Sequence, residues 1–368
     1  LKFDALGVND LLSPFLAAGF YYKTFMWPRA FWERVYEPFI RHAAGLGALA
    51  VAYDHDLYEK AYAHCDVLII GAGPSGLMAA LAAARAGLDV ILADENDRVG
   101  GRLLSEVEEV GSVAGHIWAE GIGAELVGLA NVKVMTNSTV TGAYDQGTYG
   151  ALERVGHHLD AAPKGLPLET FWRITAKRTI LCAGALERQI AFKDNDRPGI
   201  MTASGMRSYL NRYGVSPGQK IAIFGNNSDA HRTACDFSNA GVDVVAMIDS
   251  RAGVLSKGDY RFYAGAQVVG TSGRLGLQSI TIRQDGMLNT IECDALGVSG
   301  GWNPSVHLTC HMNGRPVWDA GLASFLPQEN AIPGMSVAGA AAGTMSTAGA
   351  LAQGYEIAQS AAKDLGKR

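Results

Sequence analysis

The sequence predicts an α/β fold built around a dinucleotide-binding βαβ unit, and three features of residues 66–102 indicate it. An apolar run at Val67–Ile70 is typical of a buried parallel strand. The pattern G-x-G-x-x-G follows directly, and an Ala-rich helical stretch covers Leu77–Ala86. A second apolar run at Val90–Ala93 is followed by an acidic residue, as expected where an acid meets a ribose hydroxyl. Strand, loop, helix, strand and acid therefore come in the order that a bound adenine dinucleotide requires.

Each glycine of the motif has its own task. Gly71 permits the tight turn, Gly73 lets the backbone approach a pyrophosphate, and Gly76 lets helix and strand pack closely. The helix that follows would direct free N–H groups and its positive dipole end at the phosphates. Asp94, with Glu95 beside it, is the predicted ribose ligand, and two acids favour NAD over NADP.

Composition narrows the class of protein. The chain has 368 residues, with 48% hydrophobic and 18% charged residues and a net charge of −5, which gives no reason to expect nucleic acid as a partner. The five cysteines are scattered without a C-x-x-C pair, which argues against an iron–sulfur cluster or a zinc ribbon and fits a reducing cytoplasm. Uncharged runs are broken by Gly and Pro, so no membrane span is expected. The HLTCH stretch at 307–311 has no second ligand cluster nearby, and we expect no metal.

Residues 1–64 form an aromatic-rich N-terminal segment. Nine aromatic residues crowd the stretch from Phe20 to Phe39, and a helix is expected to start at Trp27-Pro28. Phe31, Val35 and Phe39 then share one helix face. We interpret the segment as a docking surface for another domain or subunit, with packing on its own dinucleotide domain as the alternative.

A second Rossmann-like unit is predicted within residues 198–299, inserted into the first. Its strand at Lys220–Phe224 leads into the loop GNNSDA, in which only Gly225 remains of the glycine motif. We therefore interpret this unit as a scaffold with a degenerate nucleotide site. The dinucleotide-binding domain is expected to comprise residues 65–197 plus 300–368, including a β meander that ends in the A-G-A turn at 183–185.

This order of units resembles the flavoprotein oxidoreductases with two dinucleotide-binding domains. Several phrases are more specific, among them FYYKTFMWPRAFWERVYEP, ADENDRVGGR, ILCAGALERQIAFKDNDRPGIM and VSGGWNPSVHL. Over essentially the whole chain they resemble the alpha subunits of heterotetrameric sarcosine oxidases. The chain opens at Leu1 without an initiating Met, and we expect it to be a fragment covering the dinucleotide-binding domains of such a subunit.

The resemblance implies a division of labour among subunits. In that family the alpha subunit binds NAD, sarcosine is oxidised to glycine at FAD on the beta subunit, and oxygen is reduced to hydrogen peroxide at an FMN near the alpha–beta boundary. Gamma and delta subunits complete the complex, and folate binds a C-terminal region of alpha that is absent here. Flavin reductases of the superfamily hold their flavin with a Gly-Asp pair, but this chain has Gly339-Ala340. NAD is therefore the expected ligand of this chain, with FAD and FMN on or shared with the partner.

Motif and resemblance together predict the cofactor-binding residues, while catalytic residues are expected on the partner. The predicted residues are Gly71, Ala72, Gly73, Pro74, Ser75, Gly76, Asp94, Glu95, Gly100, Gly101, Arg102, Ala183, Gly184 and Gly339. Two other functions stay open: a stand-alone FAD/NAD(P)H-dependent oxidoreductase, and the alpha subunit of a related amino-acid or opine dehydrogenase complex.

Overall fold

The computed structural model describes residues 27–43, 51–160, 163–328 and 330–367, in two units that meet between His55 and Asp56. The first unit contains a π-helical turn, η2 (Trp32–Tyr36), that continues as α3 (Glu37–Ala43). The helix thus begins a turn later than the Trp27-Pro28 start expected from the sequence. Four of the nine aromatic residues of the expected cluster, those from Phe20 to Phe25, lie outside the described residues.

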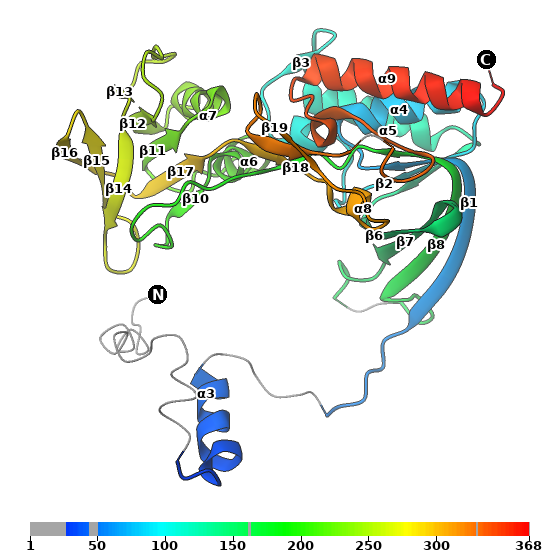
Figure 1. The fold of residues 1–368 in the computed structure, drawn as a ribbon, viewed down its shortest axis with the longest axis horizontal. Coiled ribbons are helices and arrows are strands. Elements are labelled where there is room, and N and C mark those ends of the chain that lie inside the picture. Colours follow the sequence, from blue (N-terminus) through cyan, green and yellow to red (C-terminus); the bar gives the residue numbers. More distant parts are fainter. Residues whose placement is uncertain (1–26, 44–50, 161–162, 329, 368) are drawn as a thin grey trace. The chain divides into compact units, whose positions relative to one another are not determined.

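The second unit opens with a mixed sheet, in which β6 and β7 are antiparallel additions to a parallel part that carries the glycine motif (Figure 1). The strands run in the order β5-β2-β1-β8-β7-β6, and β21 also pairs with β8. Their bounds are β1 (Tyr58–Ile70), β2 (Val90–Ala93), β5 (Val132–Met135), β6 (Ser138–Tyr144), β7 (Thr148–Arg154), β8 (Glu169–Leu181) and β21 (Met335–Val337). Parallel pairing of β1 with both β2 and β8 buries β1 in the middle of the sheet, so its end is a natural place for a ligand.

Helices cover one face of this sheet. They are α4 (Pro74–Arg85), α5 (Gly115–Val127) and α9 (Thr347–Asp364), which lie together in Figure 1. Fully buried alanines of α4, such as Ala79 and Ala83, pack in one core with Ala358 and Ala362 of α9. Small side chains let the two helices come close, which explains the Ala-rich sequence. The other face is covered by short segments that include α8 (His307–Cys310).

The inserted unit contains a second parallel sheet, which is covered by helices on one face and by a small antiparallel sheet on the other. Its strands run in the order β10-β17-β11-β12-β13, with α6 (Ala203–Tyr213) and α7 (Ser228–Asn239) packed on it. A separate antiparallel sheet of three strands, β14-β15-β16, contributes to the core on the opposite face. The bounds are β10 (Ile200–Thr202), β11 (Lys220–Gly225), β12 (Asp243–Asp249), β13 (Phe262–Ala264), β14 (Gln267–Ser272), β15 (Ser279–Gln284), β16 (Met287–Glu292) and β17 (Ala295–Ser299). All of these strands fall within residues 198–299.

The remaining short elements join or flank the two sheets. They are η3 (Gly101–Leu104), β3 (Glu109–Val110), β4 (Val113–Ala114), η4 (Asp145–Gly147), β9 (Ala185–Glu187), β18 (Trp302–Pro304), β19 (Val317–Asp319), β20 (Ser324–Leu326) and η5 (Gly339–Ala342). Strands β9 and β18 pair with each other where the chain leaves and re-enters the first sheet. Strand β1 reaches back to Tyr58, so its first residues fall inside the segment that the sequence assigned to docking. Among the described residues, no helix is both long and apolar enough to cross a membrane.

Candidate functional site

The turn between β1 and α4 needs two of its glycines for the fold itself. Gly71 has φ +101°, and a Cβ there would lie 2.4 Å from the carbonyl oxygen of Cys182. A Cβ at Gly76 would lie 1.8 Å from the carbonyl oxygen of Gly71. Both contacts are far inside van der Waals distance, so any larger residue at either position would displace backbone.

Gly73 is different, because nothing in the protein requires it to be a glycine. Its φ of −72° and ψ of −175° are ordinary extended values, and a Cβ there would meet no described atom within 4 Å. The residue lines a cavity of about 540 Å³, the main cavity of this unit. The space beside Gly73 is therefore kept open for something outside the chain, as close approach of a pyrophosphate would demand.

The N-terminus of α4 faces the same space. Gly73 is the N-cap and Pro74 the first helical residue, and no side chain accepts a hydrogen bond at this cap. Ser75 lines the cavity. Uncapped N–H groups and the positive end of the helix dipole favour a negatively charged group here.

Asp94 ties the glycine turn to the end of β2. Its Oδ2 accepts a hydrogen bond from the Ala72 N–H at 2.6 Å, and its Oδ1 accepts from the backbone N–H and the side chain of Asn96 at 2.8 and 3.0 Å. The side chain is buried yet lines the cavity. A carboxylate has about four acceptor positions, so Asp94 can also accept from ribose hydroxyls. Glu95, beside it, is exposed at the rim.

The segment after β2 packs directly on the glycine turn. The Gly100 N–H donates to the Ala72 carbonyl at 2.7 Å. Gly101 has φ +53°, and a Cβ there would lie 2.9 Å from the Cα of Gly73. Arg102 then lines the cavity, with its guanidinium 5.5 Å from the ring centre of Trp302.

The remaining walls of the cavity are formed by residues that follow β8 and by the segment just before α9. Ala183 and Gly184 follow β8 and line the cavity. Gly339 has φ +69° and donates its N–H to Gln353 Oε1 at 2.8 Å, and Ala340 stands next to it. This wall, at the Gly339-Ala340 turn, has no carboxylate of its own.

Of the predicted cofactor-binding residues, most line this one cavity. Those that do are Gly71, Gly73, Pro74, Ser75, Asp94, Glu95, Gly101, Arg102, Ala183, Gly184 and Gly339. The other three predicted residues do not line the cavity. They are Ala72, Gly76 and Gly100, and they hold the glycine turn through the backbone contacts described above. The cavity also includes Ser138, Thr139, Thr141, Trp302, His307, His311 and Thr344–Thr347, which the sequence did not single out for cofactor binding.

The HLTCH stretch and the cysteine that lines the cavity both have partners within the protein. His311 accepts a hydrogen bond from the Ala143 N–H at 3.2 Å through Nδ1, and in the part of the chain that the structure describes no group of three or more residues is arranged to hold a metal. Burial raises the pKa of the Cys182 thiol to about 12, with Ser75 Oγ at 3.7 Å from its sulfur. A thiol that stays protonated is not a nucleophile.

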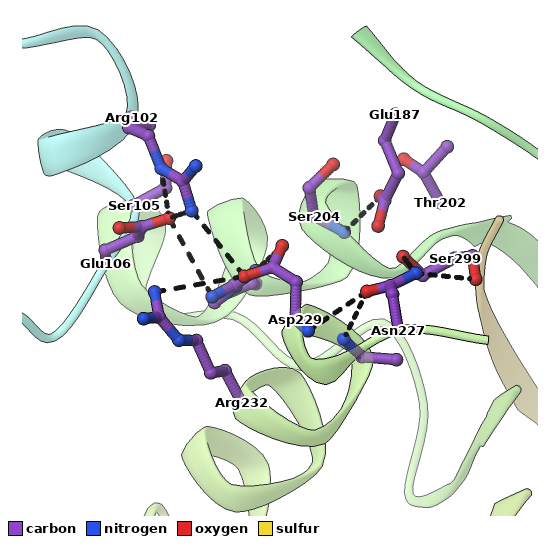
Figure 2. A network of polar contacts seen from close by, with 12 residues as sticks. Arg102, Ser105, Glu106, Glu187, Thr202, Ser204, Asn227, Asp229, Arg232 and Ser299 are labelled. Carbon is purple, nitrogen blue, oxygen red and sulfur yellow. Dashed lines mark hydrogen bonds and ion pairs between the residues drawn. The ribbon is translucent and has the colours of Figure 1, made fainter. Parts of the chain in front are cut away.

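The turn of the inserted unit is filled by the protein's own side chains. Asn227 Oδ1 accepts from the N–H groups of Asp229 and Ala230 at 3.0 and 3.2 Å, where a phosphate would otherwise bind (Figure 2). At the end of β12, the buried Asp249 is hydrogen-bonded by His231 and Arg251, both at 2.8 Å. The helix N-terminus and the acid at this second position therefore both have internal partners.

Comparison with known proteins agrees with this architecture. The fold is that of a Rossmann-type flavoprotein, and the family of FAD dependent oxidoreductases matches residues 66–156. The structure is similar to L-proline dehydrogenase from P. horikoshii, with a TM-score of 0.67 at 21% identity over 86% of this chain and 58% of that one. It is also similar to T. acidophilum thioredoxin reductase, with a TM-score of 0.63 at 19% identity over 82% of this chain and 99% of that one. The predicted fold class is confirmed.

The particular family is that of the sarcosine oxidase alpha subunits, to which this chain belongs. The chain is 48% identical over its full 368 residues to the sarcosine oxidase alpha subunit of Rhizobium meliloti (strain 1021), of which it covers 37%. It is 36% identical over 338 residues to the alpha subunit from Corynebacterium sp. (strain P-1), covering 88% of this chain and 35% of that one. The chain thus spans little more than a third of these relatives. The resemblance predicted from the sequence, and the assignment to an oxidoreductase subunit, are confirmed.

Proposed function

We propose that this chain is the NAD-binding part of the alpha subunit of a sarcosine oxidase-type complex. The observation that carries the proposal is the open space beside Gly73, which the fold does not need and a pyrophosphate does. Its walls supply the uncapped end of α4 for phosphate and Asp94 for ribose. A volume of about 540 Å³ is in the usual range for a ligand of cofactor size.

Residues at both ends of the cavity support NAD as the dinucleotide. Asp94 and Glu95 at the ribose end disfavour a 2′-phosphate, which supports NAD over NADP. At the other end Ala340 stands where flavin reductases place an acid, and the Gly339 N–H is already bound to Gln353. These features support NAD in this chain, with FAD and FMN on or shared with the partner subunit.

The chemistry of the complex would then lie mainly outside this chain. Sarcosine is oxidised to glycine on the beta subunit, oxygen is reduced to hydrogen peroxide, and folate binds a region of alpha beyond this chain. The residues of this chain bind and orient the adenine dinucleotide and form one wall of the region near the shared flavin. All five cysteines lie in described positions and are free, which supports a reducing, cytoplasmic setting.

The N-terminal helix supports a partner surface. Phe31, Val35 and Phe39 lie four residues apart, and their exposed fractions are 47%, 48% and 75%. An exposed aromatic stripe is typical of the core of an interface. We propose that it docks on another subunit of the complex, among beta, gamma and delta.

A second candidate is a self-sufficient FAD/NAD(P)H oxidoreductase. The match to FAD dependent oxidoreductases and the likeness in fold to a thioredoxin reductase favour it. Such an enzyme needs a working nucleotide site in the inserted unit, however, and Asn227 occupies that turn. A complex that oxidises opines is a variant of the first proposal, because one of the opine oxidase subunits of Rhizobium meliloti (strain 1021) is 24% identical over 346 residues.

Two measurements test the proposal. Calorimetric titration of the nucleotide-free chain should show one NAD site and at least about tenfold weaker binding of FAD. Co-expression with a beta subunit should give a complex that releases hydrogen peroxide when sarcosine is added. Tight FAD binding with NADPH oxidation by the chain alone would instead establish the second candidate.

A further inference from the structure

A cluster of charged side chains joins the loop after η3 to the inserted unit (Figure 2). Its members are Arg102, Glu106 and Glu108 from the dinucleotide-binding domain, Arg207 from α6, and Asp229 and Arg232 from α7. The side chains of Arg207 and Glu106 are only 3% and 5% exposed, and that of Asp229 is 13% exposed. Such a buried cluster between two units holds its members in fixed positions.

Arg102 is held along one edge of its guanidinium. Its Nε donates to Glu106 Oε1 at 2.5 Å, and Nη2 pairs with the same oxygen and lies 3.5 Å from Asp229 Oδ1. Among the described residues, Nη1 has no hydrogen-bond or ion-pair partner, and Figure 2 draws no contact from it. Because Arg102 also lines the main cavity, its unused donors remain available to a ligand there.

The position of Asp229 explains how the inserted unit contributes to holding Arg102. Asp229 is the second residue of α7, where a Rossmann unit that binds a nucleotide directs its N–H groups at phosphate. Asn227 accepts those N–H groups instead. The Asp229 carboxylate is then free to pair with Arg207 at 2.7 Å and with Arg102.

Stability alone does not account for this arrangement. One carboxylate oxygen of Glu106, Oε2, is buried without a hydrogen-bond partner among the described residues. A buried polar network that leaves an acceptor unsatisfied costs stability relative to an apolar contact. The cluster is thus a costly way to hold the two sheets together, which favours a second role for it.

We propose that Asp229 and Glu106 are positioning residues that hold Arg102 against the pyrophosphate of the bound dinucleotide. The inserted unit, with its own turn filled, thereby serves the site of the dinucleotide-binding domain. Arginine loses much rotational freedom when it is fixed on a ligand, so orienting it in advance strengthens binding. The inference rests on the proposed function, namely that the main cavity binds an adenine dinucleotide.

The test compares NAD with adenosine, which lacks the pyrophosphate, by calorimetry on the nucleotide-free full chain. Asp229→Asn should raise the Kd for NAD about 5- to 20-fold and leave the Kd for adenosine within about twofold. The matched control is Asp97→Asn, which removes a more exposed ion pair to Arg212, at 3.1 Å, between the same two units. The control should leave both constants unchanged.

An unchanged NAD Kd in Asp229→Asn would overturn the inference, and so would equal losses for NAD and adenosine, which would show a general distortion. If Asp229→Asn does not fold, Glu106→Gln must show the same split between the two ligands. A double-mutant cycle adds a further criterion: on an Arg102→Lys background, Asp229→Asn should have little further effect. A wild-type chain that binds neither NAD nor FAD would instead refute the proposed function.

Discussion

Gly73→Ala separates the folding role of the glycine turn from its binding role. A methyl group at this position meets no described atom within 4 Å, and the backbone values of −72° and −175° suit any residue. Replacing Gly with Ala restricts the unfolded chain and gains about 0.4–1 kcal/mol. Alanine is a poorer N-cap than glycine by a similar amount, about 1 kcal/mol at most. The free energy of unfolding should therefore change by less than about 1 kcal/mol.

The affinity for NAD, in contrast to the stability, should change strongly in Gly73→Ala. The added methyl group occupies the space beside Gly73 that a pyrophosphate needs. We expect the NAD affinity to fall at least about 100-fold, which corresponds to about 3 kcal/mol. Gly73→Val should abolish binding altogether.

Thermal unfolding and NAD calorimetry on the same preparations provide the assay, with Gly71→Ala and Gly76→Ala as controls. At these two positions a Cβ would lie 2.4 and 1.8 Å from a carbonyl oxygen, so the fold itself should lose about 3 kcal/mol or more. Full NAD binding by Gly73→Ala would refute the assignment of the cavity. Unfolding of Gly73→Ala would show that the space beside it is not open.

Three further predictions concern the ribose end of the cavity, Asp249 and the buried cysteines. NADP should bind at least about tenfold more weakly than NAD in calorimetry at matched salt, because Asp94 and Glu95 repel a 2′-phosphate; equal affinities would show that neither acid faces the ribose. Burial alone would raise the pKa of Asp249, but hydrogen bonds from Arg251 and His231 outweigh it and lower that pKa. Its stabilisation is therefore present above about pH 4 and lost below, so the Tm difference between wild type and Asp249→Asn should shrink as the pH falls from about 7 to 3; a difference that is constant with pH would contradict this. Burial raises the pKa of the thiols of Cys65, Cys182 and Cys293 to about 12, so a thiol reagent at about pH 8 should leave these three unmodified in the folded chain and react only with Cys235 and Cys310.

The sequence was most informative where one short segment carries the whole signal. The glycine turn, its helix and Val90–Ala93 needed no distant partner to be recognised, and β2 has those bounds in the structure. Longer-range pairing was harder to predict. Local patterns do not show that Glu169–Leu181 is a single strand, because pairing with β1 and β7 on either side is what holds it as one.

The sequence of Val132–Tyr144 alternates like that of a single strand. The chain instead turns at Asn137, with φ +51°, and forms β5 and β6 in different parts of the sheet. Asparagine tolerates this conformation, so Asn137 was an available signal for a turn. The turn matters for the site, because it brings Ser138–Thr141 into the wall of the cavity.

Helix α6 has boundary signals that can be read from the sequence. Thr202 Oγ1 accepts from the Gly205 N–H at 3.2 Å at the start, and Gly214, with φ +65°, ends it. The contact between Asp229 and Arg102 was beyond the reach of local patterns, because it depends on how two separately folded sheets meet. A loop that had lost its glycines could be predicted from the sequence as degenerate, but not as a positioning element for another site.

The identity of the nucleotide that the purified chain releases decides whether the cavity is an NAD site. The chain is denatured, and the supernatant is identified by mass spectrometry and quantified by absorbance. We predict a colourless protein that releases NAD, at up to about one molecule per chain, from the cavity beside Gly73. Release of FAD from a yellow protein would contradict the assignment of NAD to this chain. A chain that releases no nucleotide and binds none in calorimetry would contradict the interpretation of the cavity itself.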